Sequence, residues 1–146
     1  MRERARRAVQ ILPLMPKVLF CAGLVELSLR VMPLAEVCTF LQVRLLMEPP
    51  DPSCRVATVH DVSSRDQVRL RAVRVVYRHW PVARDRQCLR FSLVAGQLLR
   101  EADPCLRIGV NRFEGRFVAH AWLVLDGDLQ LDSSAVLYQP LTASRT

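Results

Sequence analysis

The sequence is short of glycine and lacks the residue spacings that bind nucleotides or metals. Only 5 of its 146 residues are glycine, and neither a Walker nor a dinucleotide-binding pattern is present, so ATP and NAD chemistry have no support. The five cysteines are widely spaced, with no C-x-x-C pair and no zinc spacing to a histidine. We therefore expect no metal, no cofactor and no disulfide framework. Free thiols predict a reducing compartment, the cytoplasm.

Lysine is almost missing, although the chain is basic. Of the 21 Lys and Arg residues only Lys17 is a lysine, and the net charge is +7. Such an arginine bias can arise from a GC-rich genome, and a nucleic-acid surface would be expected to add lysines and interleaved aromatics. We expect no nucleic-acid partner. The charge favours an acidic peptide or an acidic protein surface instead.

A long uninterrupted hydrophobic run is absent as well. Arginines within residues 2–7 precede an apolar stretch, in the order of a signal peptide. Prolines and charged residues interrupt this stretch at Pro13, Pro16, Lys17 and Glu26. The longest unbroken run, Val18 to Val25, is too short for a bilayer span, which needs about 20 residues. We expect no membrane association; a signal peptide, or weak binding of this basic, apolar segment to a membrane surface, is the alternative.

The first part of the chain has the periodicity of helices. Apolar residues recur at helical spacing over residues 17–47, and Pro33 predicts the start of a second helix or a kink. Prolines within residues 48–53 end this part. We divide the chain into an N-terminal helical region, residues 1–60, and a core, residues 61–146, which together form one compact domain.

The second part changes from helix to strand. One helix is predicted after Ser63 or Ser64, either of which can be its N-cap, and it ends at Trp80-Pro81. A second, buried helix carries Cys88 in its first turn and runs to Arg100. Strands are expected at residues 105–110, 116–125 and 129–131, with a hairpin turn at 126–128. Helices followed by an antiparallel sheet predict an α+β fold.

Cys88 is the candidate nucleophile because of its place in the second helix. With Asp85 as N-cap, Cys88 lies where unpaired N–H groups and the helix dipole favour a thiolate, the reactive form of cysteine. The same N–H groups, including the Cys88 backbone, can form an oxyanion hole. The side chain of Gln87 is a candidate second donor.

His120 and Asp132 are the candidate partners of Cys88. His120 lies between small neighbours in a predicted apolar strand, which leaves room beside its ring. A three-residue turn at Asp126–Asp128 would pair Trp122 with Asp132 and place this carboxylate on the His120 face, whereas a two-residue turn would place it on the opposite face. We interpret Trp122 as packing beside the site, with substrate contact as the alternative. Nucleophile, histidine and acid in this order are typical of papain-like and transglutaminase-like enzymes.

Four short motifs extend this pattern. They are Asp85-Arg86-Gln87-Cys88-Leu89-Arg90-Phe91-Ser92-Leu93, Leu106-Arg107-Ile108-Gly109-Val110, Ala119-His120-Ala121-Trp122-Leu123 and Tyr138-Gln139-Pro140-Leu141. In combination they resemble the leader peptidases that process lasso-peptide precursors, a transglutaminase-like family. The resemblance covers residues 62–141 and departs at Phe91, where the family more often has a basic residue.

The resemblance implies a papain/transglutaminase-like core in which Cys88, His120 and Asp132 cleave the leader from a ribosomally made lasso-peptide precursor. It implies a stand-alone peptidase that works with a separate leader-recognition protein and with an ATP-dependent lasso cyclase. Three alternatives stay open. They are a transglutaminase-like acyl transferase, a peptidase for another class of ribosomal peptide, and a non-catalytic basic binding protein that would not need Cys88.

Overall fold

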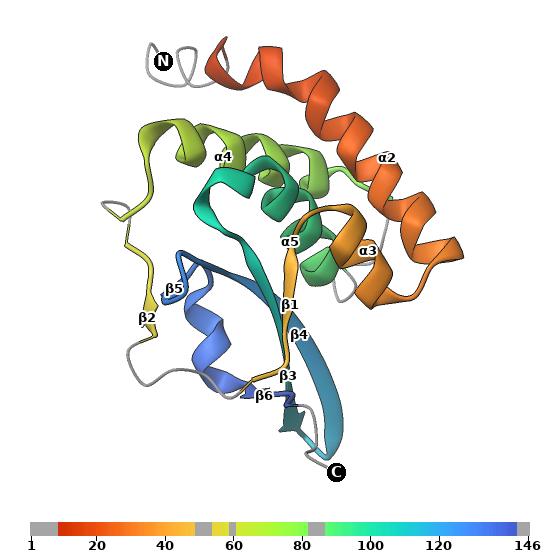
Figure 1. Ribbon diagram of the computed structural model, residues 1–146, viewed down its shortest axis with the longest axis vertical. Coiled ribbons are helices and arrows are strands. Elements are labelled where there is room, and N and C mark those ends of the chain that lie inside the picture. Colours follow the sequence, from red (N-terminus) through yellow and green to blue (C-terminus); the bar gives the residue numbers. More distant parts are fainter. Residues whose placement is uncertain (1–8, 49–53, 59–60, 82–86, 143–146) are drawn as a thin grey trace.

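Helices cover one face of a sheet whose longest strands form an extended hairpin (Figure 1). The computed structural model describes residues 9–48, 54–58, 61–81 and 87–142. Helices and a mixed sheet confirm the predicted α+β class. The main elements are α2 (Met15–Val31), α3 (Leu34–Phe40), α4 (Ser64–Arg78), α5 (Gln87–Leu98), β3 (Cys105–Phe113) and β4 (Arg116–Leu125).

The N-terminal helices divide where the sequence predicts. Pro33 has an extended backbone (φ −66°, ψ 152°) and is the N-cap residue of α3, so a second helix begins there. The helix predicted over residues 17–47 is too long, however, because β1 (Arg44–Leu46) occupies its last part. Gln42 has a left-handed backbone (φ 57°) that ends the helical path, and β1 then pairs in parallel with β3.

Helix α2 is apolar on both of its faces. It buries Val18, Ala22 and Val25 against the core, whereas Phe20 on the outer face is 72% exposed. With the preceding 3-10 turn η1 (Leu12–Leu14) it forms a helical segment, Val9–Val31, that is long and apolar enough to cross a membrane by length and composition alone. A core helix or a signal sequence passes the same test. The cytoplasmic location and the lack of membrane association stay predictions.

Helix α4 begins where its capping residue predicts. Ser63 is the N-cap, and its hydroxyl accepts a hydrogen bond from the backbone N–H of Asp66 (3.1 Å). The buried side of the helix, which includes Tyr77, packs against α2 and α5. Beyond its end, the indole of Trp80 donates to Glu26 of α2 (3.3 Å), which joins the two helices.

Helix α5 lies at the centre of the fold. It contacts α2, α4 and β4, and Leu93, Val94 and Ala95 in its middle are fully buried. Gly96 permits close approach of the chain before β1, since a Cβ there would lie 2.7 Å from Cγ2 of Val43. The predicted N-cap, Asp85, lies outside the described residues.

The sheet contains the predicted hairpins and two parallel edges. β3 and β4 are antiparallel, and a three-residue turn joins β4 to β5 (Leu129–Gln130), with Leu125 opposite Leu129. The order is β1-β3-β4-β5-β2, and β6 (Gln139–Pro140) pairs with β3. The expectation of a purely antiparallel sheet is wrong at β1 and at β2 (Arg55–Val56), which pair in parallel with β3 and β5. Both are too short to show a period-two pattern.

The two faces of β4 contribute to separate cores. Ala121 and Leu123 join the large core beneath the helices. Trp122 and Val124 pack on the other face with Ala135 of the 3-10 segment η4 (Ser133–Leu137). β4 is therefore buried on both faces from Ala121 onward, and this burial fixes the position of His120, which precedes Ala121.

Candidate active site

Cys88 lies half-buried in the first turn of α5, as predicted. Its N–H is one of the first in the helix and has no acceptor within it. One turn later, the hydroxyl of Ser92 donates to the carbonyl of Ala121 in β4 (3.2 Å). The backbone N–H of Ala121 helps to lower the pKa of the Cys88 thiol. The start of α5 and the middle of β4 therefore meet at the thiol.

His120 occupies the middle of β4, opposite Gly109 of β3. Its Nε2 lies 2.6 Å from Oδ2 of Asp132. The imidazole also hydrogen-bonds the Cys88 thiol, and because Nε2 faces the carboxylate, Nδ1 is the nitrogen available to the sulfur. The structure thus brings the three predicted residues together in one chain of contacts.

Asp132 reaches His120 in a way that differs from the prediction. It was expected to pair with Trp122 inside the sheet, but β5 ends earlier, and the following backbone contact is Leu131 N to Leu123 O (3.0 Å). Asp132 is instead the N-cap residue of η4. The odd turn length placed the carboxylate beside the histidine correctly, although outside a strand.

Ser134 is a site residue that the sequence reasoning missed. Its N–H and its hydroxyl donate to Oδ1 of Asp132 (2.8 and 2.7 Å), which leaves Oδ2 for His120. The hydroxyl also lies 3.4 Å from Nε2 of the imidazole. The sequence Asp-x-Ser, typical of a capped turn, is the signal that could have found it.

The three side chains shift one another's pKa values toward an ion pair. Asp132 and then Cys88, opposed by burial, raise the pKa of His120 from 6.5 to about 9. The bond to His120, with help from Ser134 and against burial, lowers the pKa of Asp132 from 3.8 to about 2. Burial alone would raise the pKa of Cys88, but His120 and two backbone N–H groups outweigh it and lower this pKa below 9.0. A thiolate beside an imidazolium is favoured.

Cys21, Cys38 and Cys105 lack this activation. Burial raises the pKa of Cys38 to about 11, and it also raises the pKa values of Cys21 and Cys105. Cys21 and Cys38 are buried, as their apolar sequence context predicts. Burial raises the pKa of each of these thiols, and only at Cys88 do an imidazole and backbone N–H groups lower it again.

An aromatic frame holds the imidazole from the side. Tyr138 stacks on His120 (ring centroids 4.8 Å apart, planes at 28°), and Trp122 is nearly parallel to it at 6.1 Å. Trp122 is only 2% exposed, which supports packing rather than substrate contact as its main role. Gly109 makes room for the frame, because a Cβ there would lie 2.8 Å from the Trp122 ring and 2.9 Å from Cβ of Tyr138. Tyr138 and Gly109 were noticed in the sequence only as parts of motifs.

The three residues open into a cleft of about 400 Å³. Gln87, Arg74 and Phe91 line it together with the three site residues, so the candidate oxyanion donor Gln87 faces the same space as the thiol. A second, more apolar hollow of about 360 Å³ lies against Cys88 and His120 as well, lined by residues that include Leu89, Ile108 and Ala119. A chain bound across the thiol would have space in both directions.

The comparison with protein families matches residues 23–144 to a family described as the transglutaminase-like superfamily. The chain belongs to this superfamily. Its members are in general cysteine proteases or transferases. No curated protein and no solved structure matches the chain. The match crosses the boundary predicted at residue 60, and the large core draws on residues from both sides of it; the two-part division stays a prediction.

A transglutaminase-like site of this composition can perform acyl chemistry with its own side chains. A thiolate attacks a carbonyl carbon, a charged imidazole supplies a proton to the leaving group, and a carboxylate holds that imidazole in place. Within the described part of the chain, no three His, Cys, Asp or Glu side chains are grouped so that they could hold a metal ion.

Proposed function

We propose that this protein is a cysteine peptidase that removes the leader from a lasso-peptide precursor, with Cys88, His120 and Asp132 as its triad. The observation that carries the proposal is the chain of contacts from the Cys88 thiol through His120 to Asp132, open to a cleft. Membership of the transglutaminase-like superfamily supports cysteine-based acyl chemistry. The lasso-peptide substrate rests on the motif resemblance.

In this mechanism the Cys88 thiolate attacks the carbonyl carbon at the junction of leader and core. The N–H of Cys88 and the side chain of Gln87 stabilise the oxyanion. The His120 imidazolium protonates the departing core amine, and a leader thioester remains on the sulfur. His120 then takes a proton from water, whose oxygen attacks the thioester, and the leader leaves as a carboxylic acid while the thiolate is restored.

The partners follow from the same proposal. A separate leader-recognition protein presents the precursor, and an ATP-dependent cyclase uses the freed core amine. The net charge of +7 suits an acidic leader or an acidic partner surface.

The test is mass spectrometry of a precursor peptide incubated with the protein and the recognition protein. We expect cleavage at one leader–core bond, and we expect Cys88→Ala to abolish it. Cys38→Ala removes a buried thiol from α3, which does not line the cleft, and should leave cleavage intact in the folded protein. Intact precursor with folded protein and bound leader would contradict the peptidase proposal.

Acyl transfer is the second candidate, because the superfamily includes transferases. The same reaction run with added glycinamide distinguishes the two. A peptidase releases the leader as a free acid, whereas a transferase releases a leader amide that carries the added amine. Loss of both products in Cys88→Ala is expected for either activity, and a non-catalytic binding protein would form neither.

A further inference from the structure

A smaller hollow of about 190 Å³ adjoins the catalytic cleft. Arg74 of α4 and Leu131 line both spaces, so the two adjoin at these residues. Its walls are α4, including Arg71, and the segment that contains Thr58. The hollow therefore lies beside the catalytic cleft, on a surface that carries two arginines one helical turn apart.

Arg71 and Arg74 make no ion pair or hydrogen bond within the described part of the chain. Their neighbour on the same helix, Arg69, is paired with Asp66 (2.9 Å). Arg74 is exposed and Arg71 is half-buried. Two positive charges thus face a concave space without a carboxylate of their own.

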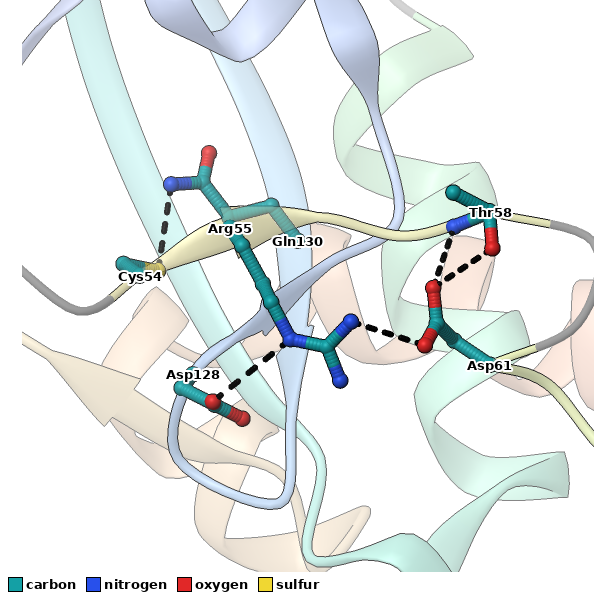
Figure 2. Close-up of polar contacts among 6 residues, drawn as sticks. All are labelled: Cys54, Arg55, Thr58, Asp61, Asp128 and Gln130. Carbon is teal, nitrogen blue, oxygen red and sulfur yellow. Dashed lines mark hydrogen bonds and ion pairs between the residues drawn. The ribbon is translucent and has the colours of Figure 1, made fainter.

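Asp61, which precedes Val62 of the opposite wall, does not line the hollow and already has other hydrogen-bond partners (Figure 2). Asp61 accepts hydrogen bonds from the Thr58 hydroxyl (2.7 Å), from the Thr58 N–H (2.8 Å) and from Arg55 (2.7 Å). These contacts hold the pKa of Asp61 well below its usual range. The Asp61 carboxylate is paired with Arg55, which also lies 3.9 Å from Asp128. It therefore does not neutralise the charges of Arg71 and Arg74 on α4.

The wall itself is fastened to the sheet. Arg55 N donates to Asp128 O (2.8 Å), Ala57 N donates to Gln130 O (2.7 Å), and the Gln130 amide contacts the sulfur of Cys54 at 3.1 Å. Figure 2 shows the contact of Gln130 with Cys54, together with the side-chain contacts of Arg55 with Asp61 and Asp128. The hollow is therefore formed before any substrate arrives, which lowers the cost of ordering a bound chain.

We propose that this hollow is a specificity subsite that binds an acidic side chain of the peptide substrate through Arg74 and Arg71. The inference rests on the proposed peptidase function. A guanidinium binds a carboxylate through two parallel hydrogen bonds, and a pair of arginines can hold it from two sides. Because the subsite adjoins the catalytic cleft at Arg74, the acidic residue lies near the scissile bond.

The first arm of the test needs no knowledge of the substrate. The thiolate of Cys88 displaces iodide from iodoacetate, an anion, or from iodoacetamide, which is neutral, and mass spectrometry gives the rate at Cys88 for each reagent. Arg74→Gln should lower the ratio of the iodoacetate rate to the iodoacetamide rate by about two- to tenfold. Arg74→Lys keeps the charge and should keep most of the ratio.

Arg100→Gln is the matched control, because it removes one exposed arginine beyond the far end of α5. It should leave the ratio unchanged. An equal change in Arg74→Gln and Arg100→Gln, or no change in either, would overturn the subsite. The iodoacetamide rate on its own reports whether Cys88 is activated, so a failure of the proposed nucleophile is seen separately.

The second arm uses synthetic precursor peptides in which one Glu is moved through the positions around the junction. At one position Glu should raise kcat/KM about tenfold over Gln for the wild type and not for Arg74→Gln. Arg74→Glu should prefer Lys at that position. If the same Glu effect persists in both variants, the acidic residue is bound elsewhere and the proposal is wrong.

Discussion

Cys38 and Cys88 both lie in helices, yet only the Cys88 thiol has a lowered pKa. Cys38 on α3 is almost fully buried among apolar side chains, and its pKa rises to about 11. Cys88 on α5 is also partly removed from water, yet its pKa falls below 9.0. The comparison shows that burial makes a thiol inert unless a strand supplies partners. At Cys88, β4 supplies an imidazole and a backbone N–H.

The largest effect is expected from a substitution that removes the negative charge beside His120. Asp132→Asn keeps the shape of the side chain but no longer stabilises the imidazolium, so kcat/KM for precursor cleavage should fall by roughly 10²- to 10⁴-fold. Asp128→Asn is the matched control, since it loses only a 3.9 Å contact with Arg55. Equal losses in the two variants would show that Asp132 has no special role.

The pH dependence of alkylation sharpens the contrast between the two thiols. Reactivity of Cys88 with iodoacetamide should persist below pH 9, where an ordinary thiol is mostly protonated, because its pKa is lowered. Cys38 should react only toward pH 11. His120→Gln removes the imidazole that lowers the pKa of Cys88. Burial, which raises this pKa, is then less compensated, and the pKa of Cys88 should rise. Cleavage itself should decline as pH rises through about 9, where His120 loses its proton. An unchanged Cys88 profile in His120→Gln would contradict this coupling.

Sequence reasoning succeeded where the site depends on local periodicity. The helix start at Cys88, the strand around His120 and the odd turn before Asp132 are all local patterns, and together they brought the three residues to one place. Roles of these residues in catalysis stay predictions. The site could be predicted because its three residues follow one another within one short segment, residues 88–132.

The same reasoning failed where long-range packing decides. Residues 44–46 fit the helical spacing before them, but they form a strand because β3 offers a free edge. Strand β2 is two residues long and is fixed by contacts of Arg55 with Asp61 and Asp128. Such elements have no periodicity of their own, since partners distant in sequence determine them.

A backbone substitution can disturb the site without touching the triad. Gly109→Ala would bring a Cβ within 2.8 Å of the Trp122 ring and 2.9 Å of Tyr138, the two rings that flank His120. Overpacking of this kind costs about 1–3 kcal/mol of unfolding free energy. Denaturant unfolding gives that loss, and the Cys88 alkylation profile should shift with it. A stable variant with an unchanged profile would show that the frame does not hold the imidazole.

The smallest expected effect lies in the N-terminal region and has the opposite sign. Gly23 is exposed within α2, and a Cβ there would meet no atom within 4 Å. Gly23→Ala removes the conformational freedom of glycine from the unfolded chain, and it should raise the free energy of unfolding by about 0.5–1 kcal/mol. Because α2 contacts α5 through its buried face and not through Gly23, cleavage and Cys88 alkylation should stay as in the wild type. A loss of alkylation in Gly23→Ala would mean that the outer face of α2 is coupled to the thiol, and the separation between the two regions would then be wrong.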